Sequence, residues 1–175
     1  EELLGINVSV TMGELQTIRI RIIGEVKKPG GYTVSSMTNL MNALFASGGI
    51  KRTGSLRNIQ LKRNDKLVAN FDLYEALLEG KLNTNLSMQH DDVIFVPAIG
   101  PVVGVGGEVK RPAIFELKHE RTLGEVIGLA GGLLPTAALD SSHIERIEEG
   151  QFHTLIDFDL PLSNINKTVI KPGDL

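Results

Sequence analysis

Residues 24–29 read Gly-Glu-Val-Lys-Lys-Pro, and residues 107–112 repeat the motif as Gly-Glu-Val-Lys-Arg-Pro, 83 positions later. The same offset relates the double glycine at residues 48–49 to the double glycine at residues 131–132. A motif and a double glycine that both recur at the same offset indicate a tandem duplication. A functional site is therefore to be sought in a repeated small module rather than in a single enzyme pocket.

The repeat predicts how the chain is divided into domains. We expect a lead-in segment at residues 1–16, a first domain at residues 17–99 (copy one) and a second at residues 100–175 (copy two). Each copy is long enough to bury a small core of its own. Copy two reads Lys-Pro-Gly-Asp-Leu at residues 171–175, and in copy one the corresponding residues 89–93 lead into further strand residues. We therefore expect copy two to be incomplete at its last strand.

The composition excludes several classes of protein. With 42% apolar and 22% charged residues, the chain is typical of a soluble globular protein, and the absence of cysteine excludes disulfide frameworks, thiolate zinc sites and iron–sulfur clusters. Residues 1–97 carry 11 basic and 10 acidic side chains, a net charge of +1, and residues 98–175 carry 7 and 11, a net charge of −4. Neither balance is the basic footprint of a nucleic-acid-binding protein, so we expect no nucleic acid partner.

Strands are predicted where apolar and polar residues alternate. Residues 17–24 alternate with β-branched residues, which is typical of a half-buried strand. Proline and two glycines at residues 28–31, Gly30 among them, predict a turn that sends residues 32–34 back as the partner strand. The other predicted elements of copy one are a second hairpin at residues 59–71, a short helix capped by Asp72 and a closing strand at residues 93–96.

One main helix is predicted in each copy, over residues 39–47 and 122–130, because apolar residues recur there at spacings of three and four. A mixed sheet packed on one main helix is the β-grasp layout, so the predicted fold class is α+β with two tandem β-grasp domains. The glycines expected to end the two helices at positive φ are Gly48, Gly49, Gly131 and Gly132.

This ordered set of motifs resembles tandem SLBB domains, the soluble-ligand-binding β-grasp modules of bacterial polysaccharide export proteins. The resemblance covers residues 17–175. Copy two departs from it where Ala113 replaces the glycine after proline, and where residues 139–142 read Leu-Asp-Ser-Ser in place of Gly-Ser-Leu-Arg. The motifs that carry the resemblance in copy one are residues 24–30 with Tyr32, residues 39–49, residues 54–57, residues 72–74 and residues 91–97.

The resemblance implies a non-catalytic role in exporting capsular polysaccharide or exopolysaccharide across the Gram-negative outer membrane. It implies a periplasmic location, with attachment to the outer membrane through a longer parent protein. In that family, β-grasp modules stack into the wall of an oligomeric ring. Glycan and an inner-membrane polysaccharide copolymerase are the implied partners, and no cofactor is implied.

The basic turns are the candidate ligand-binding residues. An acidic sugar polymer, or the acidic face of a partner, could contact these turns, with a further contribution from an arginine in copy one. The alternative interpretation is a solvated hairpin tip whose charges keep the tip soluble and prevent strand pairing. The candidate residues are Lys27, Lys28, Arg57, Lys110 and Arg111.

No catalytic or metal site is predicted. The glycines at residues 104–107 are not followed by a helix N-terminus, as a dinucleotide fingerprint requires, and no nucleophile elbow is present. His90, Asp91 and Asp92 fall where copy two has Pro-Gly-Asp, so we expect a turn in which the shared aspartate binds backbone. Two other functions stay open: a β-grasp adaptor domain of a cofactor-dependent or redox complex, and a free carbohydrate-binding module.

Overall fold

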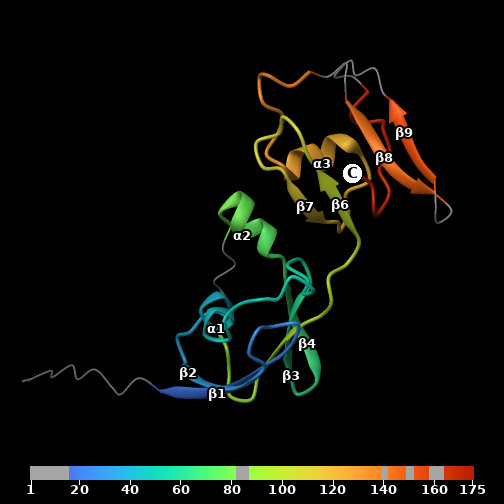
Figure 1. Cartoon of the computed structure of the whole chain (residues 1–175). Helices are drawn as coiled ribbons and strands as arrows, with labels where there is room; N and C mark the ends of the chain where they lie inside the picture. The colour runs from blue at the N-terminus through green and yellow to red at the C-terminus, as the bar shows by residue number, and fades with distance from the viewer. Residues whose placement is uncertain (1–15, 82–86, 139–141, 149–151, 158–163) are drawn as a thin grey trace, which may run out of the picture.

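The computed structural model describes residues 16–81, 87–138, 142–148, 152–157 and 164–175. The predicted lead-in segment, apart from Gln16, and residues 139–141 of the divergent copy-two segment lie outside the described residues. Within the described ranges the chain forms two successive α+β units, as the sequence predicts (Figure 1). The predicted boundaries of the two copies stay predictions.

Copy one is built around a parallel pair of strands from its two ends. β1 (Thr17–Gly24) pairs in parallel with β5 (Val93–Val96) and antiparallel with β2 (Gly30–Ser35). The main helix α1 (Leu40–Ala46), capped by Asn39, packs on one face, which completes the β-grasp arrangement. The remaining elements are β3 (Ile59–Arg63), β4 (Lys66–Phe71) and α2 (Leu73–Glu79), and the sheet order is β2-β1-β5-β3-β4.

The period-two pattern divides this sheet into two faces. Ile20 and Ile22 of β1 and Ile94 and Val96 of β5 have no exposed surface, and they pack against Leu44 of α1. Side chains that alternate with them point to the opposite face, because successive residues of a strand alternate sides. We call this second face, which α1 does not cover, the outer sheet face.

Copy two repeats the plan with a different sheet. Its strands form two separate pairs, β6–β7 and β8–β9. Residues 173–175 lie between the pairs: the Gly104 amide donates to the Asp174 carbonyl at 2.8 Å, and the Glu145 amide donates to the Leu175 carbonyl at 2.7 Å. The corresponding bond in copy one runs from the Arg21 amide to the Asp92 carbonyl at 2.9 Å. The elements are β6 (Val102–Val105), β7 (Ala113–Glu116), α3 (Leu123–Leu129), β8 (His143–Glu148) and β9 (Phe152–Asp157).

A buried arginine–aspartate pair is also repeated. Asp92 accepts two bonds from Arg63, at 2.8 and 2.9 Å, and one from the Gln89 amide at 2.7 Å. Asp174 accepts two bonds from Arg146, at 2.8 and 2.7 Å, and a third from a backbone amide, that of Lys171. Burial acts to raise the pKa of Asp174, but these bonds and the charge of Arg146 hold it below its ordinary value. The predicted aspartate–backbone turn is confirmed in both copies.

The helix-ending glycines are confirmed, and the first turn needs a correction. Gly48, Gly49, Gly131 and Gly132 all have positive φ. Gly30, predicted within the turn, is instead the first residue of β2, and the positive φ falls on Gly24 at 91°. A Cβ on Gly24 would lie 2.1 Å from the Val96 carbonyl oxygen, so the parallel β1–β5 pairing itself requires glycine there.

Candidate functional site

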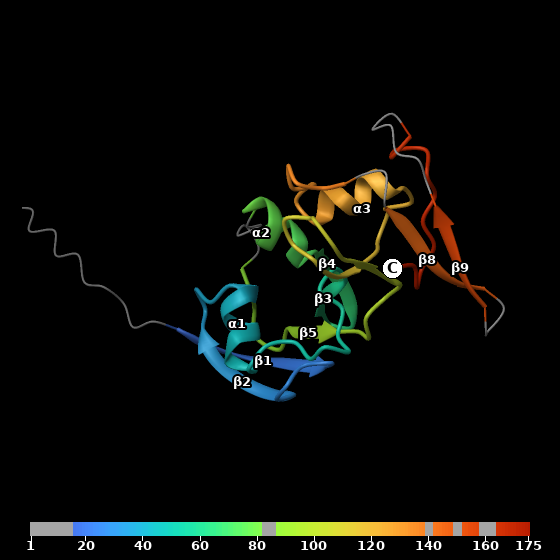
Figure 2. The same cartoon turned by 45° about the horizontal axis from the view of Figure 1, so that its top comes forward.

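Copy one and copy two meet at a polar contact that we call the joint. It lies beyond α2, on the side of copy one that faces β7 and the turn that follows β7 (Figure 1, Figure 2). The joint consists of Ser55, Leu56, Arg57, Asp72 and Tyr74 from copy one, Gly100 from the linker (residues 97–101, between β5 and β6), and Glu116, Lys118 and Glu120 from copy two.

Glu116, at the end of β7, fastens three parts of the chain together. One carboxylate oxygen accepts hydrogen bonds from the Ser55 hydroxyl at 2.7 Å and from the Gly100 amide at 2.9 Å. The other oxygen accepts from the Leu56 amide at 2.9 Å. The side chain is buried, and these donors are uncharged dipoles that satisfy it. One residue of copy two thus holds a loop of copy one and the linker at once.

Arg57 is the cation at the centre of the joint. Its Nε donates to Asp72 at 3.1 Å, and its Nη1 lies 2.9 Å from both carboxylate oxygens of Glu120. Nη1 also donates to the backbone carbonyl of Glu116 at 3.0 Å. Burial acts to lower the pKa of Arg57, but the hydrogen bond to Glu120 and the two carboxylate charges raise it overall. A buried, satisfied guanidinium of this kind fixes geometry, because removing any partner leaves a charge without compensation.

Glu120 stays ionised down to low pH. Burial acts to raise its pKa, but hydrogen bonds from the backbone amides of Lys118, at 2.8 Å, and of Glu120 itself lower it, and Arg57 adds its bonds and charge. The result is a pKa of about 2, against an ordinary value of 4.5. Glu120 therefore keeps its charge, and its attraction for Arg57, well below neutral pH.

Tyr74 and Asp72 complete the contact from the start of α2. The Tyr74 hydroxyl accepts from the Glu116 amide at 2.9 Å, and its ring lies 4.7 Å below the Arg57 guanidinium. The same ring packs edge-on against Phe115, with centroids 6.4 Å apart, so it also borders the core of copy two. Asp72 caps α2 through the Tyr74 amide and accepts from Lys118 at 3.3 Å.

The segment at residues 54–57 explains how copy one presents these groups. Gly54 is buried, and a Cβ there would lie 2.6 Å from Ile50 and 2.7 Å from the Glu25 carbonyl oxygen. The Ser55 hydroxyl accepts from the amides of Arg57 and Asn58, at 3.1 and 2.9 Å, and so closes a tight turn. Glycine allows the close approach and serine shapes the turn, which leaves Arg57 directed at copy two.

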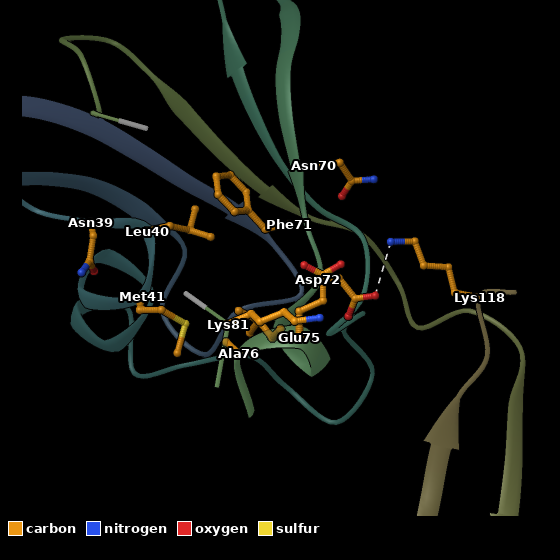
Figure 3. A pocket seen from close by; sticks show the side chains of 11 residues that line it. Asn39, Leu40, Met41, Asn70, Phe71, Asp72, Glu75, Ala76, Lys81 and Lys118 are labelled. Carbon is orange, nitrogen blue, oxygen red and sulfur yellow. Dashed lines mark hydrogen bonds and ion pairs between the residues drawn. The ribbon is translucent and has the colours of Figure 1, made fainter. Parts of the chain in front are cut away.

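A small pocket lies beside the joint (Figure 3). Its volume is about 90 Å³, smaller than the roughly 300–1,000 Å³ of typical small-molecule sites. Figure 3 shows Lys118 of copy two reaching across to Asp72 at one side of the pocket, with Phe71 and Met41 on its apolar side. The pocket is therefore a recess at the edge of the contact between the copies.

The basic turns lie elsewhere, at the ends of the main helices. The Lys27 and Lys28 amides donate to Gly49 and Ser47, and the side chains of both lysines are exposed. In copy two the Lys110 amide donates to Gly132 in the same way. The side chain of Arg111 donates to the Leu129 carbonyl at 3.2 Å and covers Gly131. The structure does not bring Arg57 into either turn.

Sequence reasoning missed most of the joint. It selected Arg57 but overlooked Glu116, Glu120 and Tyr74. The repeat itself holds a signal for two of them, because at the offset of 83 Glu116 corresponds to Thr33 and Glu120 corresponds to Met37. A charged residue that replaces a neutral one at a repeat position marks a place where the two copies have different roles.

Neither a metal-binding cluster nor a membrane-spanning helix is found among the described residues. They contain no group of three or more histidine, aspartate or glutamate side chains arranged to hold a metal ion. Each described helix has seven residues, and none is long and apolar enough to span a bilayer. What the joint can do chemically is orient two domains through satisfied charges.

Comparison with known proteins agrees with this architecture. Residues 18–96 and residues 102–153 each match a sequence profile of the SLBB domain. Polysialic acid transport protein KpsD of Escherichia coli is 30% identical over 118 residues, 65% of this chain and 20% of KpsD. EPS I polysaccharide export outer membrane protein EpsA of Ralstonia nicotianae is 29% identical over 96% of this chain and 46% of its own length. EpsA of Ralstonia solanacearum is 30% identical over 75% of this chain and 36% of that protein.

The chain belongs to the SLBB domain family and carries two such domains in tandem. The resemblance stated from the sequence is thereby confirmed. The chain spans about a fifth of KpsD and just under half of EpsA from Ralstonia nicotianae.

Proposed function

We propose that this chain is a non-catalytic, periplasmic segment of an outer-membrane polysaccharide export protein, in which the two SLBB domains act as one rigid wall unit. The observation that carries the proposal is the similarity of both domains, in tandem, to proteins named for polysaccharide export. Copies of the unit would assemble side by side into a ring around the exported polymer. An inner-membrane copolymerase would meet the ring from the opposite side of the periplasm.

The joint supports the role in a channel wall, because the domains of a wall must keep a fixed orientation relative to one another. Each of the two copies is small, and a flexible link between them would let them move independently. The buried contacts of Glu116 and Arg57 instead tie the linker and both copies together. In a ring, a fixed angle between the domains of every protomer would fix the dimensions of the channel.

Contact with acidic polymer at the basic turns is the second part of the proposal. Lys27 and Lys28 are exposed and have no ion pair within the described part of the chain. Lys110 is exposed in the equivalent turn of copy two, while Arg111 is held on α3. Each exposed lysine would add a modest, salt-sensitive attraction.

The test is made in the full-length parent protein in its own cell. Arg57→Ala and Glu116→Ala together should reduce the polysaccharide exported to the cell surface, while the protein still reaches the outer membrane in normal amount. The matched control is Lys66→Ala, at an exposed site outside the joint and outside the basic turns. If deletion of residues 17–175 leaves export unchanged, the proposed role in export is wrong. If the deletion abolishes export but the joint variant does not, the rigid-wall part alone is wrong.

A further inference from the structure

The outer sheet face of copy one gathers residues from all five strands of the sheet. Arg19 and Arg21 of β1 lie on this face, because they alternate with the buried residues Ile20 and Ile22. Arg21 pairs with Val93 of β5. Val93 in turn pairs with Lys62 of β3, and Lys62 pairs with Leu67 of β4, so the same face continues across these strands. The other residues of the face are Ile23, Gly31, Thr33, Gln60, Lys62, Leu67, Asn70, Val93 and Phe95.

Charge on this face has one sign. The face carries three cations, Arg19, Arg21 and Lys62, and its register positions include no acidic residue. Arg19 and Arg21 are exposed, and within the described part of the chain none of the three cations forms an ion pair. Like charges gathered on one sheet face raise the local positive potential, which an anionic partner would relieve.

An aromatic ring lies among the cations. Phe95 of β5 is half-buried on the outer face, and the Lys62 ammonium lies 4.9 Å from the centre of its ring. Ile23, directly opposite Phe95 on β1, is 42% exposed. The face therefore pairs an apolar platform with a cation above it, next to two guanidinium groups that can bind carboxylates in bidentate fashion.

The same face in copy two has lost these features. At the offset of 83, Arg19 and Arg21 correspond to Val102 and Gly104, and Lys62 corresponds to Glu145. Thr33 corresponds to Glu116, which docks against copy one. The basic face is thus a property of copy one, and the fold does not require it, since copy two keeps the fold without it.

We propose that the outer sheet face of copy one binds a carboxylated polysaccharide, with Arg19, Arg21 and Lys62 pairing to carboxylates and with Phe95 and Ile23 forming an apolar surface beside them for the C–H face of the sugars. The inference rests on the proposed role in export, which makes a glycan the ligand. It deepens that role by placing binding on a sheet face that the sequence did not select. The charge complementarity favours an acidic sugar over a neutral one.

The test uses the purified chain and defined polymers. Polysialic acid and polygalacturonic acid serve as carboxylated probes, dextran as the neutral probe and duplex DNA as the phosphate probe. Arg19→Glu with Arg21→Glu should weaken binding of a carboxylated probe about tenfold or more, because each reversal turns an attraction into a repulsion. Arg19→Lys with Arg21→Lys should retain most of the binding, and Phe95→Leu should weaken it with every charge kept.

The matched control is Lys66→Glu with Lys167→Glu, which changes the charge of the chain equally at exposed sites outside both the outer sheet face and the basic turns. Circular dichroism of each variant establishes that it folds. The proposal is overturned if the control variant loses as much binding as the face variant, if no carboxylated probe binds at low salt, or if duplex DNA binds more tightly than both carboxylated polymers. If the binding proposal fails in this way but deletion of residues 17–175 abolishes export, the binding site is wrong and the proposed role in export is retained.

Discussion

The two copies share a fold but use the same sheet face differently. In copy one the outer sheet face is open and carries Arg19 and Arg21, whereas in copy two the corresponding face carries Glu116, which is buried against copy one. The cores, the double glycines and the arginine–aspartate pairs are repeated in both. What is repeated builds each domain, and what differs connects the domains or faces a partner.

The largest effect is expected from removing the cation of the joint. Arg57→Ala leaves the buried carboxylates of Asp72 and Glu120 without their main partner, which should lower the free energy of unfolding by about 3–5 kcal/mol. Urea denaturation followed by circular dichroism measures the change. The exposed Lys27→Ala variant should stay within about 0.5 kcal/mol of the unaltered chain. Equal stability of the two variants would mean that the contact between the copies contributes nothing.

Substituting the equivalent glycines Gly24 and Gly107 compares the stability of the two copies directly. Gly24→Ala forces a Cβ to within 2.1 Å of the Val96 carbonyl oxygen, so β5 has to move, whereas Gly107→Ala meets no atom within 4 Å. Both positions have positive φ, so the copy-two variant should cost about 1–2 kcal/mol and the copy-one variant clearly more. Thermal unfolding of the two variants side by side gives the difference. A larger loss in Gly107→Ala would contradict the parallel β1–β5 contact as the cause.

Sequence periodicity was enough for the repeated part of the structure and insufficient for the joint. Alternation in residues 17–24 and helical spacing in residues 39–47 reflect local burial, which a sequence carries directly. The joint depends on where one domain lies against the other, so Ser55 meets Glu116 across 61 positions with no local pattern to reveal it. The first turn is predicted at residues 28–31 from its proline and glycines, but the glycine with positive φ is Gly24. That glycine is required by its contact with Val96, which is distant in sequence, so the local pattern could not reveal it.

A smaller loss is expected at the carboxylate of the joint. Glu116→Gln keeps the size of the side chain but turns an amide group toward N–H and O–H donors that need an acceptor. The free energy of unfolding should fall by about 1–3 kcal/mol, the cost of leaving buried donors without acceptors. The matched control is Thr33→Gln, at the equivalent exposed position of copy one. A larger loss in this control would refute the difference assigned to the two faces.

The smallest effect is a dependence on acid. The pKa of Glu120 is about 2 in the folded chain against an ordinary 4.5, so its stabilising contribution is complete above about pH 4.5 and is lost as the pH falls toward 2. Asp174 also has a lowered pKa, so its protonation in acid lowers the stability of copy two as well. The comparison is therefore made between the unaltered chain and Glu120→Gln. The difference in their stability should shrink between pH 5 and pH 2; a constant difference would mean that Glu120 does not titrate through the joint.

The most direct measurement of the central claim is the distance between the two copies in solution. The chain has no cysteine, so Lys27→Cys and Lys110→Cys, both at exposed turns, allow one spin label in each domain. If the joint makes the copies one rigid unit, pulsed electron spin resonance should give a single narrow distance distribution. Adding Arg57→Ala and Glu116→Ala should broaden it. A distribution that is already as broad in the chain with its joint intact would contradict the claim.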